Sequence, residues 1–235
     1  MSDGGSIQTI VELRRRLADR ADDEYREFIM KGIPSERPFI GVRIPQIREI
    51  ISEVPAEKID EFLKEEPVAF EEVIARGFLV CRLSYGKMIE RFDSQILHID
   101  DWCACDTFCS AVAKKIKRHK TEFFEEKLDK LLADSSREFA VRVGLVLLKC
   151  AYVEPEWLQV IFDRVEKLAK REEYYIRMAI AWLLCDCFIK YPTATTGYMA
   201  SSGLPVWTLN KTISKICDSH RVDEETKELV RKMRK

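Results

Sequence analysis

Three cysteines crowd the stretch HIDDWCACDTFCSAVAKKIKRHK, residues 98–120. Cys103, Cys105 and Cys109 suggest a metal site, but their C-x-C-x3-C spacing is not the paired C-x2-C pattern of structural zinc sites. His98 is the nearby imidazole that would complete a tetrahedral set. The alternative is that the thiols are buried as small hydrophobic side chains, and we favour it over a metal. A cysteine nucleophile would also need a nearby base, whereas the three histidines of the chain are widely separated.

The same stretch offers a carboxylate and an aromatic ring at helical spacing. Trp102 and Asp106 are four residues apart, so they share one face if a helix has begun by Trp102. Asp100 or Asp101 is a suitable N-cap for that helix, a role that requires no catalytic function. No glycine-rich phosphate loop or dinucleotide-binding pattern is present in the sequence.

Two further residues are unusual for the apolar segments that contain them. Arg142 lies in FAVRVGLVLL, where a guanidinium needs a partner or access to a groove. It is also one turn from Glu138, which is an alternative partner. Trp182 lies in RMAIAWLLCD and is either a core residue or part of a site.

Local positive charge suggests a polyanionic partner although the net charge of the 235-residue chain is only −1. Cations near expected helix ends are candidates for phosphate binding. They are Arg43, Arg48, Lys114, Lys115, Lys117, Lys211, Lys215 and Arg221. The alternative is that these cations belong to solvated helix faces.

The elements that must position these residues are helices. Apolar residues recur at i, i+3, i+4 and i+7 in about twelve segments, and strand-like alternation is hard to find. We predict an all-α fold, an α-solenoid of about six HEAT-like helix pairs that form a concave superhelix. The expected organisation is a single domain over residues 1–235 with a frayed start at residues 1–6. With no basic-then-apolar signal segment and no long apolar run, we expect a cytoplasmic protein.

Five segments together resemble the DNA alkylation repair family, the AlkD-like HEAT-repeat proteins. They are GVRIPQIREI, DDWCACDTFC, REFAVRVGLVLL, YYIRMAIAWLLCDCFIKYP and LNKTISKICDSHR, in the family's order and approximate spacing over residues 7 to 225. The resemblance implies a concave basic face that holds duplex DNA and a glycosylase that releases N3- and N7-alkylated purines without metal or cofactor. It also implies a carboxylate that stabilises the positively charged sugar electrostatically, with tryptophans that add cation–π attraction.

The resemblance assigns Arg142 to the groove arginine and Trp182 to a site tryptophan. Two alignments remain for the family's Trp-Trp-Asp-x-x-Asp motif. One aligns CDTFC with its Asp-containing core, which puts Cys105 at a tryptophan and Cys109 at the catalytic carboxylate, and therefore predicts an impaired enzyme. The other retains the Trp-x-x-x-Asp spacing with Trp102 and Asp106. Cys185 is a second departure, because relatives tend to be cationic one turn beyond this tryptophan.

We therefore predict a monomeric alkylpurine DNA glycosylase with Asp106, Trp102 and Trp182 as its catalytic residues. Arg142 and the eight cations near helix ends would bind duplex DNA. The alternative is a catalytically impaired member of the same fold that binds DNA or a protein without excising a base.

Overall fold

The computed structural model describes residues 5–235, and every regular element in that range is helical. The predicted all-α class is therefore confirmed. The chain separates into two compact units, Met1–Val112 and Ala113–Lys235, which are called here the first and the second unit and are described separately. A single domain over the whole chain stays a prediction.

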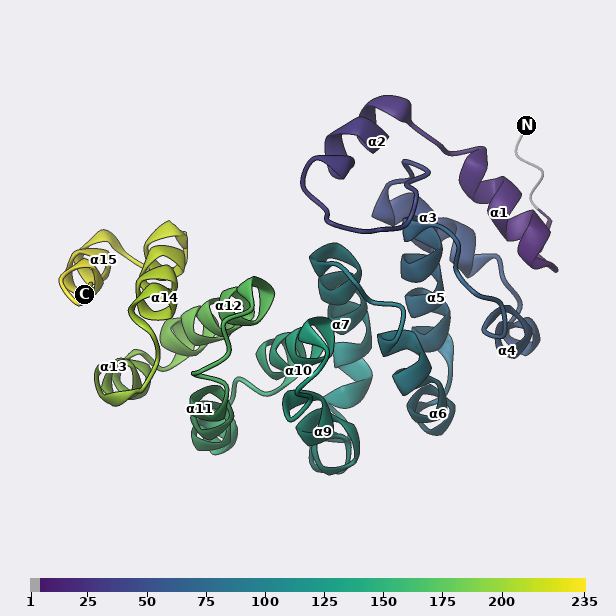
Figure 1. The fold of residues 1–235 in the computed structure, drawn as a ribbon. Coiled ribbons are helices and arrows are strands. Elements are labelled where there is room, and N and C mark those ends of the chain that lie inside the picture. The colour runs from purple at the N-terminus through teal and green to yellow at the C-terminus, as the bar shows by residue number, and fades with distance from the viewer. Residues whose placement is uncertain (1–4) are drawn as a thin grey trace. The chain divides into compact units, whose positions relative to one another are not determined.

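The described residues of the first unit form six complete α-helices and a 3-10 turn. They are α1 (Ile10–Ala18), α2 (Asp23–Met30), α3 (Ile44–Ser52), η1 (Ala56–Lys58), α4 (Ile59–Phe62), α5 (Phe70–Arg82) and α6 (Tyr85–Ile96). The long helix α7 (Trp102–Ile116) begins in this unit and crosses its boundary. Helix α3 packs against α1 and α5, and α5 packs against α4 and α6 (Figure 1). Helix α5 is therefore the central helix of the first unit.

The second unit continues the helical pattern. It contains α8 (Lys120–Phe123), η2 (Phe124–Leu128), α9 (Asp129–Leu132), α10 (Glu138–Ala151), η3 (Pro155–Trp157), α11 (Leu158–Lys167), α12 (Tyr174–Lys190), α13 (Pro192–Ser201), α14 (Val206–Asp218) and α15 (Glu224–Arg231). Helices α10, α12 and α14 pack side by side, and α9 and α13 pack against α10 and α12 (Figure 1). Packing in chain order in two rows is the arrangement of an α-solenoid, which agrees with the predicted fold class.

The start of the chain is held by hydrogen bonds from its first described residues. Residues 1–4 of the predicted frayed start lie outside the described residues. The Ser6 hydroxyl and the Ile7 backbone N–H both donate to the Glu53 carbonyl, at 3.3 and 3.1 Å. Thr9 then caps α1 in a capping box with Glu12.

The prolines lie where their missing N–H is tolerated. Pro45 is in the first turn of α3, Pro155 begins η3, and Pro192 begins α13 directly after α12. Between α8 and α9 the chain forms the π-helical turn η2.

Helix α10 is the most deeply buried helix that carries a predicted site residue. Its residues Ala140–Leu148 are all buried, Arg142 included. Gly144 allows this close packing, because a Cβ atom there would lie 2.8 Å from Leu132 Cδ2 of α9. Side chains that leave α10 therefore reach solvent only near its ends.

Candidate functional site

Helix α7 begins at Trp102 because Asp101 caps it. Asp101 Oδ1 accepts hydrogen bonds from the backbone N–H groups of Cys103 and Ala104, at 2.7 and 2.8 Å. The neighbouring Asp100 has a different role, since its Oδ2 lies 2.6 Å from an Arg37 guanidinium nitrogen. Of the two candidate caps, the structure therefore selects Asp101.

The two alignments of this segment correspond to two faces of α7. Trp102 and Asp106 are one turn apart and both are partly exposed. Cys105 and Cys109 are also one turn apart, but each is 0% exposed. The Trp102 indole N–H donates to the Gly32 carbonyl at 2.9 Å, which anchors the ring at the accessible face. The accessible face of α7 therefore carries the tryptophan and the carboxylate, while the two cysteines face the interior.

Burial keeps several thiols protonated. Burial, followed by the carboxylate of Asp101, raises the pKa of Cys103 to about 12. Burial and the neighbouring Asp186 raise the pKa of Cys185 to about 11. A thiol with such a pKa contains a negligible thiolate fraction at neutral pH, so neither side chain is an activated nucleophile.

The Arg142 guanidinium binds the backbone at the start of α12. Its side chain is only 5% exposed, and a terminal nitrogen donates to the Tyr175 carbonyl at 3.1 Å. The Tyr175 backbone N–H donates in turn to Glu138 Oε1 at 2.7 Å. Arg142 and Glu138, the pair suggested by the sequence, thus both bind the backbone of Tyr175.

Trp182 lies beside a set of charged side chains from α10, α12 and the segment between α14 and α15. Lys149 Nζ lies 3.7 Å from the centroid of the Trp182 ring, within cation–π range. The same Nζ is 3.3 Å from Asp186 Oδ2, and Asp186 Oδ1 is 2.5 Å from an Arg221 guanidinium nitrogen. One carboxylate thus holds two cations beside the tryptophan.

Lys211 and Lys215 add positive charge without a carboxylate partner. Partial burial, then the nearby Lys211 and also Arg142, lower the pKa of Lys215 below its ordinary value. Neither lysine makes an ion pair with any residue in the described range 5–235. Two neighbouring lysines that make no ion pair in this range are a favourable place for an external anion.

The predicted cations in the N-terminal part of the chain lie over aromatic rings. Arg43 Cζ is 4.2 Å from the Tyr25 ring centroid, and its guanidinium also pairs with Asp22 at 3.1 Å. Arg48 Cζ is 4.7 Å from the Phe78 ring centroid. Both arginines are exposed at α3, so each presents a cation to solvent.

The basic end of α7 is also solvated. Lys114 and Lys117 are exposed, and Lys115 is half-buried. Among the described residues, Lys114 and Lys117 have no carboxylate partner. Their charge is therefore available to phosphate as well as to water.

The sequence prediction missed Lys149 and Asp186, although both have a periodic signal. Lys149 follows Arg142 by seven residues, two turns along α10. Asp186 follows Trp182 by four residues and so repeats the Trp-x-x-x-Asp spacing of Trp102 and Asp106. A search for that spacing throughout the chain would have found this second carboxylate.

Two classes of site are not found in residues 5–235. No group of three or more His, Cys, Asp or Glu side chains there is arranged to hold a metal ion. Among the same residues, no helix has the length and apolar character needed to cross a membrane.

Comparisons with known proteins agree with this architecture. A solved structure described as a predicted DNA alkylation repair enzyme from Enterococcus faecalis is similar, with a TM-score of 0.67 and 17% sequence identity. The similarity covers 85% of this chain and 98% of that chain, and at this identity it shows the fold alone. No curated protein matches the sequence. The model of the DNA alkylation repair enzyme family matches residues 13–216, most of the chain. This protein therefore belongs to the DNA alkylation repair enzyme family.

Proposed function

We propose that this protein hydrolyses the N-glycosidic bond of N3- or N7-alkylated purines in duplex DNA. The observation that carries the proposal is the orientation of α7. Its accessible face presents Trp102 and Asp106, whereas Cys105 and Cys109 are completely buried. This orientation supports Asp106, and not Cys109, as the group that meets the substrate.

The reaction can be assisted by one carboxylate beside the sugar. An alkylated purine carries a positive charge, so it leaves as a neutral base when the bond from C1′ to the purine nitrogen breaks and the electron pair stays with the purine. The positive charge then develops on the sugar, and water adds to C1′ with loss of a proton. In this proposal the Asp106 carboxylate stabilises the sugar cation electrostatically and orients the water.

Aromatic rings would assist by attracting the same cation. Trp102 is one turn from Asp106 on α7. In the second unit Trp182 is the other aromatic candidate, and its ring already attracts the Lys149 ammonium group at 3.7 Å. Phosphate binding is proposed for Arg142, whose guanidinium is mostly buried, and for the predicted exposed or half-buried cations. Those cations are Arg43, Arg48, Lys114, Lys115, Lys117, Lys211, Lys215 and Arg221.

The test compares two residues of α7. Release of 7-methylguanine from methylated duplex DNA is measured in single-turnover conditions for wild type, Asp106→Asn and Cys109→Ala. We expect Asp106→Asn to reduce the rate by about 100-fold or more, because an electrostatic group of this kind contributes factors of that size. Cys109→Ala should retain the rate to within a few-fold once circular dichroism shows that it is folded.

A second function, DNA binding without base excision, is favoured by one observation. The unpaired charges of Lys211 and Lys215 do not depend on Asp106. If wild type and Asp106→Asn bind duplex DNA equally and neither releases a base above the uncatalysed rate, binding is the function. Equal release by both proteins would instead remove Asp106 from the mechanism.

A further inference from the structure

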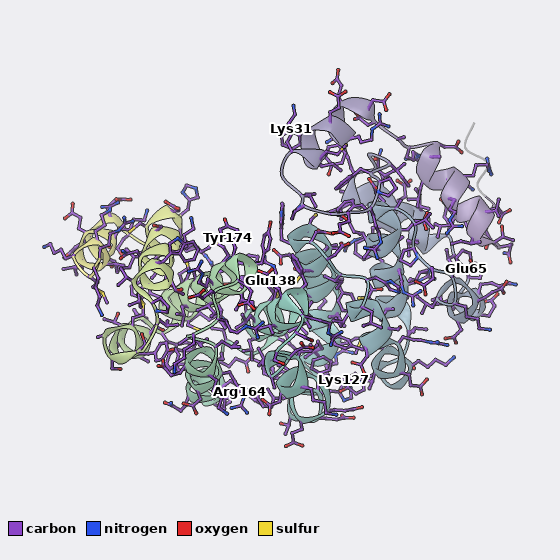
Figure 2. The ribbon with its side chains drawn as sticks, viewed as in Figure 1. Lys31, Glu65, Lys127, Glu138, Arg164 and Tyr174 are labelled. Carbon is purple, nitrogen blue, oxygen red and sulfur yellow. The ribbon has the colours of Figure 1, made fainter. Side chains whose placement is uncertain are left out.

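Four aromatic side chains form a continuous strip where α10, α12 and α14 begin. The aromatic strip consists of Phe139, Tyr175, Tyr174 and Trp207, in that spatial order. Successive ring centroids are 5.1, 5.1 and 6.0 Å apart. Tyr174 and Glu138, both labelled in Figure 2, mark the first residues of α12 and α10. Three helices that are far apart in the sequence thus contribute to one aromatic surface.

The far end of this strip is open to solvent. Tyr174 is 51% exposed and Trp207 is 38% exposed. The neighbouring Val206 is exposed as well. Large aromatic rings gain from burial, so a pair left open at the surface indicates a place for a flat apolar partner.

A cation without a counterion accompanies the exposed rings. Arg177 Cζ lies 4.6 Å from the centroid of the Trp207 ring. Within residues 5–235 Arg177 has no carboxylate partner, and its buried Nε makes no hydrogen bond there. Lys211, one turn after Trp207 on α14, is likewise unpaired in that part of the chain. The surface therefore combines flat apolar faces with two cations that make no ion pair in residues 5–235.

We propose that the aromatic strip binds unpaired nucleobases of a DNA strand by stacking, with Arg177 and Lys211 on the adjoining phosphates. Nucleobases are flat and flanked by phosphate, and single-stranded binding surfaces combine aromatic stacking with a basic groove. A paired base exposes no face, because its neighbours in the duplex cover both sides. An apolar peptide would leave Arg177 and Lys211 without counterions, so the charges favour nucleic acid. The inference deepens the proposed DNA-repair function and rests on it.

The test uses undamaged DNA, so that it is independent of base excision. Affinity for a single-stranded 12-mer and for the duplex of the same sequence is measured by fluorescence anisotropy for wild type, Trp207→Leu, Trp207→Phe and Tyr174→Leu. Val206→Ala is the control, because it changes an exposed neighbour that has no ring. A 2-aminopurine base in the 12-mer reports stacking through quenching of its fluorescence.

We expect Trp207→Leu and Tyr174→Leu to weaken single-strand binding about tenfold each, since stacking on one base is worth that much. Duplex affinity should change by less than about twofold, and Trp207→Phe should retain quenching that Trp207→Leu loses. Val206→Ala should match wild type. Three results would overturn the proposal. Trp207→Leu could bind the single strand as tightly as wild type does, or wild type could fail to quench 2-aminopurine fluorescence. The third is an equal loss of affinity for the single strand and for the duplex. A protein that excises alkylated bases but shows any of these results would retain the proposed function and lose only this inference.

Discussion

The two units of the molecule have net charges of opposite sign, and their charged side chains differ in how far they are paired within the fold. The first unit has 15 lysine and arginine residues against 22 aspartate and glutamate residues, a net charge of −7. The second unit has 24 against 18, a net charge of +6. The whole-chain value of −1 hides this contrast because the two nearly cancel. A near-neutral protein can therefore contain a unit whose charge suits a polyanion.

In the first unit, buried carboxyl groups hold the backbone. Glu71 is fully buried and accepts three backbone hydrogen bonds, from Ile40 at 2.9 Å, Gly41 at 2.7 Å and Val42 at 3.2 Å. Glycine is required at position 41 because the φ there is 95°, a conformation that L side chains rarely adopt. Glu72 acts similarly, with an ion pair to Arg14 at 3.1 Å. These two buried acidic residues are therefore structural.

In the second unit, several cations have no such role. Arg177, Lys211 and Lys215 are without ion pairs in the range that the structure describes. Net charge alone therefore does not identify a binding surface. Charged side chains that already form ion pairs within the fold are less available to a ligand. Charged side chains that form none can bind a ligand without breaking an internal contact.

The largest effect is expected from the buried carboxyl of the first unit. Glu71→Ala removes the acceptor of three buried N–H groups, so it should lower the free energy of unfolding by about 3 kcal/mol or more. Urea denaturation followed by circular dichroism measures it. Glu90→Ala, at an exposed position of α6, is the matched control and should change stability by less than about 0.5 kcal/mol. A loss below about 1 kcal/mol for Glu71→Ala would show that this carboxyl is not structural.

The next effect concerns the pH dependence of stability. Burial raises the pKa of Asp101 from 3.8 to about 6, although two backbone N–H groups bind its carboxylate. Between pH values of about 3.8 and about 6, the folded state therefore keeps a proton that the unfolded state has lost. The protonated Asp101 stabilises the fold below this range, and the free energy of unfolding falls as pH rises through it.

Asp101→Asn keeps an oxygen that can cap α7 and removes the titration. The wild type should lose about 2 kcal/mol more than this variant between pH 4 and pH 7, from the linkage between the pKa shift and stability. Thermal or urea unfolding at several pH values measures the difference. Parallel pH profiles for the two proteins would contradict the buried, titrating carboxyl.

The third prediction tests the unpaired charge of the second unit. Lys211→Ala/Lys215→Ala should weaken duplex DNA binding about tenfold and reduce the slope of log affinity against log salt by about 2, since each phosphate contact contributes about 0.9. Lys64→Ala/Lys87→Ala removes the same charge from the first unit and is the control. Equal losses in the two double variants would mean that only net charge matters.

The smallest effect is expected at the paired cations beside Trp182. Asp186→Asn would release Lys149 and Arg221 from their ion pairs and should strengthen DNA binding by about two- to threefold, with a steeper salt dependence. Asp163→Asn makes the same charge change at an exposed position of α11. If both variants bind DNA more tightly than wild type and by the same factor, Asp186 does not compete with DNA for these cations.

Much of the fold and part of the site could be predicted from sequence. Helical periodicity predicts the all-α class because it depends only on local spacing. Local spacing also predicts an N-cap at Asp100 or Asp101. It did not predict that Lys149 and Asp186 accompany Trp182, because that arrangement depends on contacts between helices.

Local sequence patterns specify the all-α class, the family and the two candidate faces of α7. They could not choose between these faces, because cysteine is compatible with either a core or a surface position and both pairs have the same four-residue spacing. Tertiary packing made the choice. Phe108 lies with its ring centroid 5.6 Å from that of Phe92, and a Cβ atom at Gly77 would be 3.2 Å from Phe108 Cδ2. Contacts with residues so distant in the sequence turn Cys105 and Cys109 inward and leave Asp106 accessible, and only the folded chain supplies them.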